Sequence, residues 1–288
     1  IGGNDIESIK ALENIYLNWV SADKILTTDL WSSELSKLTA NAFLAERISS
    51  INTISALCEK TGANVKDVSL AIGTDRRIGK EFLNAGPGFG GSCFKKDILN
   101  LVYIYSFYGL SHEATYWEKV VEINDWQKKR ISNLIIEKLF GTITGKKIAI
   151  LGFSFKANTN DTRESPAISI CKELINEGGK LFIYDPKVSH NQIMMDLNLP
   201  PADINNNFND GNWAYANSIA EACESSDALI ILTEWEEFRD LNWKDIKSKM
   251  RSPTWIFDTR SIVNIDEARK FGFKIWSVGQ GDSSILNS

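Results

Sequence analysis

Histidine, cysteine and proline are scarce in this chain of 288 residues, which has 2, 4 and 6 of them. The two histidines, His112 and His190, lie far from any motif, which argues against histidine-based catalysis and His-rich zinc sites. The cysteines have neither the paired spacing of metal ligands nor the density of a secreted disulfide framework, so we expect no metal site. Cys58, Cys171 and Cys223 stand in apolar, helix-like settings, where we expect them to be buried.

Long apolar runs and an excess of positive charge are also missing. No run approaches the about 18 apolar residues that a membrane span needs. The net charge of −5 argues against a basic surface for nucleic acid. With 43% hydrophobic residues the chain can fill two cores, and its length predicts roughly two domains of about 150 residues. We therefore expect a cytoplasmic two-domain protein with no nucleic-acid or membrane partner.

One segment indicates a chemistry. It reads Gly-Pro-Gly-Phe-Gly-Gly-Ser-Cys-Phe-Lys-Lys-Asp over 86–97, and its glycines allow a ligand to approach the backbone closely. Cys93 follows them at the predicted start of a helix, where the helix dipole and the adjacent Lys95 and Lys96 favour the thiolate. Asp97 comes one turn later on the same helix face. The plainer alternative is a glycine turn followed by a buried cysteine.

Four helices are predicted in the first half of the chain. Apolar spacing predicts helices over 5–20, from Ser32 or Ser33 to Cys58, from 97 to 109, and over 113–140. On the second, Lys37 and Asn41 lie one turn apart, on a face that is either solvated or directed at a substrate.

The fourth helix would be roughly 40 Å long. It carries an apolar stripe longer than one small domain would cover, which predicts a dimer formed through this helix. The stripe consists of Trp117, Val120, Val121, Ile131, Leu134 and Ile135.

The second half has the pattern of a parallel sheet. A strand over 147–151, a helix over 167–176 and a strand over 181–184 form a βαβ unit, and further strands are predicted over 228–232, 255–257 and 274–276. The turn after the first strand, Gly-Phe-Ser-Phe-Lys over 152–156, lacks the Gly-x-Gly-x-x-Gly of dinucleotide-binding sheets, so the sheet need not bind NAD.

Cations follow the strands of this sheet. Lys156 and Arg163 come after the first strand, at the edge where such sheets bind ligands, which favours phosphate or carboxylate contact. Residues 189–213, which include an Asn-rich run, are predicted to form an exposed insert without chemistry.

Several of these motifs together resemble a known family. Gly-Phe-Gly-Gly-Ser-Cys-Phe-x-Lys-Asp, over 88–97, is similar to the catalytic cysteine segment of the UDP-glucose 6-dehydrogenases, in the UDP-glucose/GDP-mannose dehydrogenase family. Those enzymes oxidise UDP-glucose to UDP-glucuronate in two NAD-dependent steps. Further matches occur in the family's order over 31–41, 77–79, 82–83, 152–156, 161–165 and 257–260.

The resemblance implies an α/β architecture. An all-helical central dimerisation domain with its connecting helix (21–140) would be followed by a Rossmann-like, parallel-sheet UDP-binding domain (141–288). Residues 1–20 would be the remnant of an N-terminal NAD-binding domain, because the dinucleotide fingerprint that opens the family is missing. We therefore expect a fragment that is inactive by itself. It would bind UDP-glucose and UDP-glucuronate and form a homodimer or a higher homo-oligomer.

The resemblance also implies roles for individual residues. Cys93 would attack an aldehyde and pass through a thiohemiacetal to a thioester, and Lys37 and Asn41 would contact substrate and stabilise the oxyanion. Asp97 would orient or deprotonate the water that hydrolyses the thioester. The remaining substrate contacts would be Arg77, Asn84, Ala85, Gly86, Pro87, Gly88, Phe89, Gly90, Phe155, Lys156 and Arg260.

Four positions have further roles or departures in this resemblance. Lys96 and Arg163 would contact the NAD cofactor, and Arg77 resembles an arginine donated across a subunit interface. Asn84 departs from the family, which often has lysine there. Two alternatives remain from the sequence: a dehydrogenase of another nucleotide sugar, such as GDP-mannose or a UDP-amino sugar, and a catalytically silent UDP-sugar-binding or dimerisation module.

Overall fold

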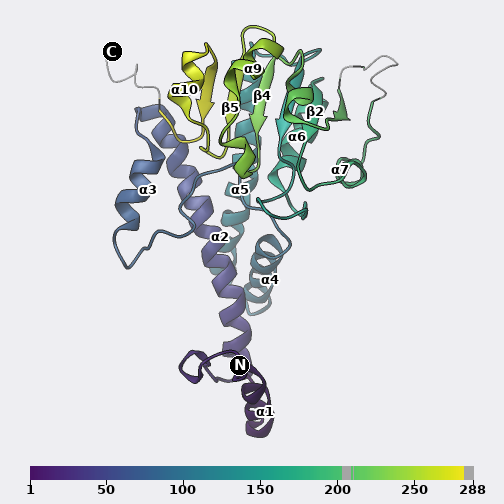
Figure 1. Cartoon of the computed structure of the whole chain (residues 1–288). Helices are drawn as coiled ribbons and strands as arrows, with labels where there is room; N and C mark the ends of the chain where they lie inside the picture. Colours follow the sequence, from purple (N-terminus) through teal and green to yellow (C-terminus); the bar gives the residue numbers. More distant parts are fainter. Residues whose placement is uncertain (203–208, 210, 282–288) are drawn as a thin grey trace.

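A helical stem carries an open parallel sheet at one end of the molecule (Figure 1). The computed structural model describes residues 1–202, 209 and 211–281. The long helices α2 and α5 run from the stem up to the sheet, and the N-terminal helix α1 lies at the far end of the stem. The predicted fold class, a helical part followed by a Rossmann-like parallel sheet, is confirmed.

The helical part of the chain is built by helices whose ends have local causes. They are α1 (Ile6–Tyr16), the short 3₁₀ helix η1 (Ala22–Lys24), α2 (Leu30–Thr61), α3 (Val65–Gly73), α4 (Phe94–Phe107) and α5 (Ser111–Lys138). The Asp29 carboxylate caps α2 by accepting the Ser32 N–H. Gly62, at a φ of 81°, ends the same helix in the left-handed conformation that favours glycine.

The apolar stripe of the long helix α5 is covered within the chain. Trp117, Val120 and Val121 are 8%, 6% and 8% exposed and pack with residues of α2 and α4, while Ile131 and Ile135 are fully buried beside the sheet. Leu134 packs partly buried against the same cluster. The prediction that a second subunit covers this stripe is therefore wrong, because α2, α4 and α6 of the same chain cover it.

The sheet has six parallel strands in the order β3-β2-β1-β4-β5-β6. This order reverses beside β1, and in such doubly wound sheets ligands bind beyond the carboxyl ends of the strands. The strands are β1 (Lys147–Leu151), β2 (Lys180–Tyr184), β3 (Asn212–Tyr215), β4 (Ala228–Ile231), β5 (Trp255–Asp258) and β6 (Lys274–Ser277).

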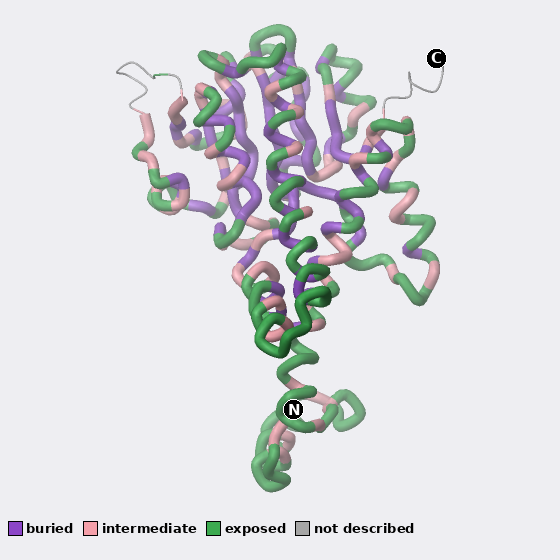
Figure 2. Tube along the Cα trace, turned by 180° about the vertical axis from the view of Figure 1, so that it is seen from behind, coloured by how far each residue is buried: buried purple, intermediate pink, exposed green. Residues whose placement is uncertain are grey.

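Helices cover both faces of the sheet because strand side chains alternate between the faces. Ile148 and Ile150 of β1 point into a core shared with α5 and α6 (Pro166–Asn176), whereas Ala149 and Leu151 point into the opposite core. That opposite core includes residues of α8 (Ile219–Cys223), α9 (Trp243–Lys249), α10 (Ile265–Lys270) and the 3₁₀ helix η2 (Glu236–Phe238). Figure 2 shows this buried body above a stem that is mostly exposed.

The prediction of an exposed insert over residues 189–213 is partly wrong. Within the predicted exposed insert 189–213, the structure has the helix α7 (His190–Leu197) and the start of β3. Ile193 and Trp213 are fully buried, and the Trp213 indole donates to the Leu199 carbonyl at 2.9 Å. The Asn-rich composition hid these anchors, and the rest of that prediction, at 203–208 and 210, lies outside the described residues. The predicted domain boundaries stay predictions, although α5 ends at Lys138 and β1 begins at Lys147.

The N-terminal part leaves apolar side chains uncovered. Helix α1 has no buried residue, and Leu12 and Ile15 on its predicted apolar face are 41% and 54% exposed. Within the described part of the chain, no helix has the length and apolar character needed to cross a membrane.

Candidate functional site

Three predicted residues from two helices meet at one carboxylate. Lys37 and Asn41, on adjacent turns of α2, both donate to Asp97 Oδ2; the Asn41 bond is 2.5 Å long. Asp97 belongs to the first turn of α4 and is only 5% exposed, whereas the Lys37 side chain is 61% exposed. The ammonium group of Lys37 therefore lies where a buried acidic group meets solvent.

The charges around Asp97 keep it ionised. Burial alone would raise the pKa of this carboxyl, but the hydrogen bonds from Lys37 and Asn41, with the charges of Lys37 and Lys96, hold the pKa below its ordinary value. An ionised Asp97 orients the two α2 donors, and it can accept a proton only weakly while both bonds persist.

Cys93 lies directly before α4, as predicted. It occupies the N-cap position, its side chain makes no capping bond, and it is exposed. Its sulfur lies 3.7 Å from the Ser92 hydroxyl, and the backbone N–H of Asp97 donates to the Cys93 carbonyl. The other three cysteines are buried, so Cys93 is the thiol that a reagent or substrate can reach.

The glycines before Cys93 let the helical part touch the sheet domain. A Cβ at Gly90 would lie 2.6 Å from the Glu164 carbonyl oxygen and 2.9 Å from Phe155 Cβ. Gly91, at a φ of 84°, donates its N–H to the Arg163 carbonyl at 2.8 Å. Only glycine permits this approach, which places the cysteine segment against the loop that follows β1.

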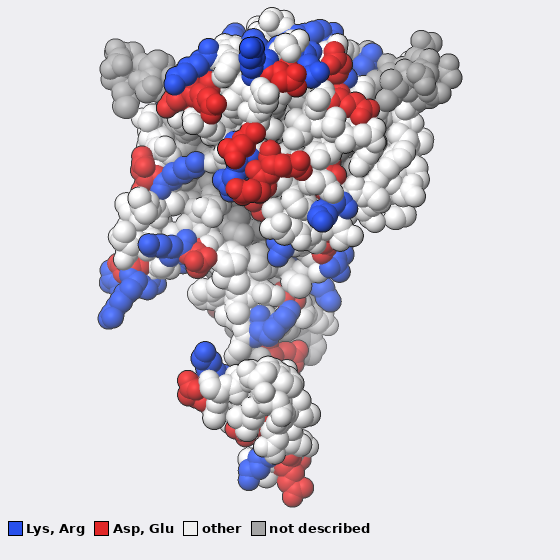
Figure 3. Space-filling view, in the orientation of Figure 1, with Lys and Arg blue, Asp and Glu red and all other residues white. Residues whose placement is uncertain are grey.

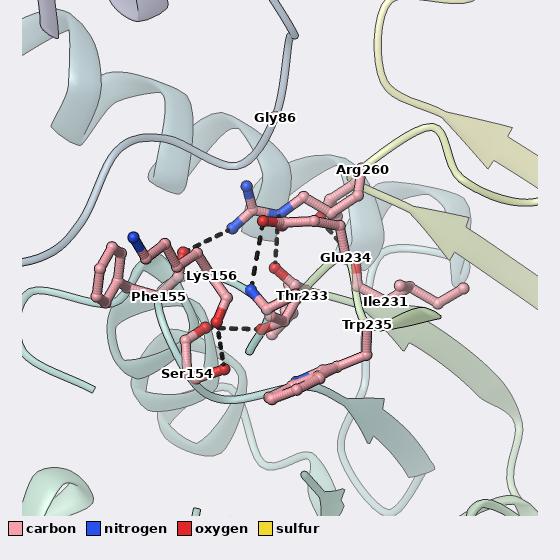
Figure 4. Close-up of polar contacts among 12 residues, drawn as sticks. Gly86, Ser154, Phe155, Lys156, Ile231, Thr233, Glu234, Trp235 and Arg260 are labelled. Carbon is pink, nitrogen blue, oxygen red and sulfur yellow. Dashed lines mark hydrogen bonds and ion pairs between the residues drawn. The ribbon is translucent and has the colours of Figure 1, made fainter. Parts of the chain in front are cut away.

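Arg260 joins the loops that follow three strands. Its Nε donates to the Leu232 carbonyl at 2.8 Å and lies 3.1 Å from Glu234 Oε2, and its Nη2 donates to the Phe155 carbonyl at 3.3 Å. Figure 4 shows the guanidinium between Glu234 and the Phe155–Lys156 segment, with the Gly86 backbone passing close by. Burial lowers the pKa of Arg260, against the opposing charges of Glu234 and Asp258, but an arginine stays protonated in this range.

Two adjoining cavities share the Arg260 region. The smaller, of about 320 Å³, is lined by the glycine segment, Phe155, Lys156, Glu234 and Arg260. The larger, of about 530 Å³, lies between α3 and the loop after β5, and it shares Asn84, Glu234 and Arg260. Four of its lining residues are cations and one is a carboxylate; the cations are Lys66, Lys80, Arg239 and Arg260.

The structure brings most of the predicted substrate contacts together. Those that line the smaller cavity are Asn84, Gly86, Gly88, Phe89, Gly90, Phe155, Lys156 and Arg260. Ala85 lines the larger cavity, and Pro87 is buried in the same loop.

The other predicted cations lie outside these cavities. The Arg77 side chain is 85% exposed and is paired with Asp75. Arg163 is exposed and paired with Asp161, which raises the pKa of the guanidinium, and Lys96 is exposed at the start of α4. Their roles stay predictions.

Residues that the sequence did not single out also shape the site. Glu234 lines both cavities, and a clue existed, because it comes shortly after a strand just as Lys156 and Arg260 do. Three buried amide side chains, Asn52, Asn124 and Gln127, hold the glycine loop from behind. A clue existed for Asn124, which falls on the apolar stripe of the long helix at helical spacing from Trp117 and Val121, whereas no pattern marked Asn52 or Gln127.

The turn after β1 does not suit a dinucleotide. The N–H groups of Phe153 and Ser154 both donate to the Asp185 carboxylate, at 2.7 and 3.0 Å, so they are not available to a pyrophosphate. A Cβ at Gly152 would lie 2.4 Å from Thr233 Cβ, which shows how tightly this turn is packed. This agrees with the absence of the glycine fingerprint from the turn.

Charges of both signs are mixed on the face shown in Figure 3. In the part of the chain that the structure describes, no three His, Cys, Asp or Glu side chains are grouped as metal ligands would be.

Fold and site together define a nucleotide-sugar dehydrogenase scaffold. The model of the UDP-glucose/GDP-mannose dehydrogenase family's central domain matches residues 31–126, and the model of that family's UDP-binding domain matches 149–265. The chain therefore belongs to the UDP-glucose/GDP-mannose dehydrogenase family, of which it contains these two domains.

Individual relatives can be compared with the chain over nearly its whole length. The chain is 49% identical to UDP-glucose 6-dehydrogenase 1 of Arabidopsis thaliana over 99% of its own length and 62% of the relative's. It is 51% identical to UDP-glucose 6-dehydrogenase of Gallus gallus over 97% of its length and 58% of that protein's. The chain thus spans about three fifths of the length of these relatives.

Solved structures share the fold at lower identity. A UDP-glucose dehydrogenase from Pyrobaculum islandicum is similar with a TM-score of 0.79 and 26% identity, over 98% of this chain and 58% of that one. A UDP-D-ManNAc dehydrogenase from Pyrococcus horikoshii gives a TM-score of 0.75 at 26% identity, over 98% and 59% of the two chains.

Proposed function

We propose that this chain forms the substrate-binding and cysteine-bearing part of an NAD-dependent UDP-glucose 6-dehydrogenase. The observation that carries the proposal is the meeting of Lys37, Asn41 and Asp97 one helical turn after the exposed Cys93. The named relatives at about half identity support UDP-glucose as the substrate.

The cavities account for the nucleotide. Arg260 lines both of them, Lys156 lines the smaller, and three further cations line the larger. A diphosphate bound near Arg260 would face cations in both cavities. The glycine backbone would let the sugar approach Cys93. In this arrangement the sheet domain binds the UDP moiety, and the helical stem binds the sugar.

This chain's own residues account for the acyl chemistry. The Cys93 thiolate adds to an aldehyde at C6, and the new oxyanion is stabilised by Lys37 and Asn41, which turn toward it from Asp97. After oxidation to the thioester, Asp97 orients the water that releases the carboxylate and regenerates the thiolate. NAD, when bound, would supply the oxidising power for both oxidation steps. The two N–H groups of the turn after β1 that could face a pyrophosphate are bonded to Asp185 instead.

Isothermal titration calorimetry tests the substrate assignment on the chain itself. UDP-glucose should bind more tightly than GDP-mannose and UDP-N-acetylmannosamine. Arg260→Met should weaken UDP-glucose binding by at least about tenfold, as loss of a charged phosphate contact does. Arg251→Met is the matched control, because Arg251 pairs with Asp227 just before β4, at the opposite end of the strands. Tighter binding of either competing nucleotide sugar would overturn the assignment.

Turnover tests the roles at the cysteine. In this chain joined to an NAD-binding domain, Cys93→Ser should reduce formation of the acid to background, because a serine hydroxyl is barely ionised near neutral pH. Asp97→Asn should slow thioester hydrolysis more than the first oxidation. Mass spectrometry during turnover should then find an acyl adduct on Cys93, and its absence would contradict the role given to Asp97.

A further inference from the structure

Side chains hold the loop that lines the smaller cavity. Between Lys80 and Gly90 the backbone makes no hydrogen bond to another backbone group, among all the residues that the structure describes. The bonds come instead from helical side chains. Arg47 donates to the carbonyls of residues 78, 79 and 81, and the Ser69 hydroxyl donates to the Leu83 carbonyl.

Around the glycines these side chains are buried amides. Asn124 Oδ1 accepts the Phe89 N–H at 2.7 Å, and its Nδ2 donates to the Phe89 carbonyl at 3.1 Å. Gln127 Nε2 donates to the Gly86 carbonyl at 2.8 Å, while Asn52 Oδ1 accepts the Gly86 N–H at 2.9 Å. The three amides are at most 1% exposed. Both polar groups of Gly86 and of Phe89 are therefore bound by side chains of α2 and α5.

The orientation of the Gln127 amide is itself fixed. Its Oε1 accepts from Arg130 Nε at 3.0 Å, and arginine has only donors, so the Gln127 NH₂ must face the Gly86 carbonyl. Arg130 is held in turn by both carboxylate oxygens of Glu59, at 2.9 and 3.2 Å. The position of Gly86 is thus determined by a series of bonded side chains, Gln127, Arg130 and Glu59, and not by solvent.

Asn124 also explains one glycine. A Cβ at Gly88 would lie 2.7 Å from Asn124 Oδ1, and the residue has a φ of 125°. The amide thus occupies the space that a side chain at position 88 would need. The backbone of this loop lines the cavity on one side and contacts Asn124 on the other.

We propose that Asn124 and Gln127, assisted by Asn52, are positioning residues that set the distance between the glycine loop and the bound nucleotide sugar. The inference rests on the proposed function for the identity of that ligand. Because the amides touch only the back of the loop, they act through it without contact to substrate. They hold the loop in the binding conformation before the ligand arrives, so that binding does not have to order it.

The test combines hydrogen exchange with binding. Asn124→Leu and Gln127→Met keep a side chain of similar shape and remove two bonds and one bond to the loop. Each should speed exchange of the loop amides at 83–91 and raise the Kd for UDP-glucose by at least about tenfold, measured where the variant is fully folded. If Asn124→Leu does not fold, Gln127→Met carries the test.

Ser132→Ala is the control on the same helix. The Ser132 hydroxyl is 1% exposed and donates to the Lys128 carbonyl, so its loss disturbs buried α5 without touching the loop. It should leave loop exchange and UDP-glucose affinity unchanged. Unchanged exchange in both amide variants would show that the amides do not hold the loop. Faster exchange, with a UDP-glucose affinity within about twofold of the parent, would show that holding the loop does not contribute to binding. A parent chain that fails to bind UDP-glucose would instead refute the proposed function, because the exchange measurement needs no ligand.

Discussion

The ion pair between Glu59 and Arg130 should be a large single contribution to the stability of this chain. Glu59 of α2 accepts from Arg130 of α5, from the Trp276 indole at 3.3 Å and from the Gly279 N–H at 2.9 Å. It therefore joins two stem helices to the end of the sheet. The perturbation is Glu59→Gln, which keeps the shape of the side chain and removes its charge.

The expected magnitude follows from burial. Breaking a fully buried pair costs about 3–5 kcal/mol, because the remaining charge stays uncompensated. The Glu59 and Arg130 side chains are 10% and 17% exposed, so water reaches them slightly. We therefore expect a loss of roughly 2–4 kcal/mol, which lowers the Tm by roughly 5–15 °C for a chain of this size.

Urea unfolding followed by tryptophan fluorescence is the assay, because Trp276 itself contacts Glu59. Arg130→Met should be destabilising as well. The double variant should be less destabilised than the sum of the two by at least about 1 kcal/mol, since neither charge is then left alone. A Glu59→Gln protein within about 0.5 kcal/mol of the parent would refute the reasoning.

Three further predictions concern the cysteines, Asp97 and assembly. Iodoacetamide should label only Cys93 in the native chain, because the other thiols are buried and burial raises the pKa of Cys223 to about 12; mass spectrometry that finds two native labels would contradict this. The folded state lowers the pKa of Asp97 below its ordinary value of 3.8, so its contribution to stability is present above that pH and lost as the pH falls through the folded value. The stability difference between the parent and Asp97→Asn should then shrink below about pH 4, and a gap that widens there would contradict the assignment. Analytical ultracentrifugation should give about twice the chain mass of 32.3 kDa, through apolar side chains such as Leu57 and Leu70 that are 59% and 63% exposed on α2 and α3. Leu57→Glu should shift the species to a monomer, and a strictly monomeric parent would rule out this interface.

The sequence by itself determined the features that depend on near neighbours. Glycines followed by Cys93, two lysines and Asp97 predicted a cysteine at a helix start, because caps and turns are decided within a few residues. That this thiol is exposed is a finding of the structure. Alternating and continuous apolar runs predicted five of the six strands for the same reason. The missing glycine fingerprint after the first strand is matched by a turn whose Phe153 and Ser154 N–H groups are bonded to Asp185.

Only the tertiary structure decided which surfaces are covered and which distant residues meet. The stripe on α5 looks exposed when the helix is considered alone, and it is buried because α2, α4 and α6 pack on it. Lys37 and Asp97 are 60 positions apart in the sequence. Lys37 donates to a carboxylate oxygen of Asp97 because α2 and α4 pack against each other there. Asn124 and Gln127 are polar residues, yet they are buried, since they bond to the backbone of a glycine loop that, among the described residues, makes no hydrogen bond to another backbone group between Lys80 and Gly90. Such pairings depend on the packing of whole elements, which no local pattern encodes.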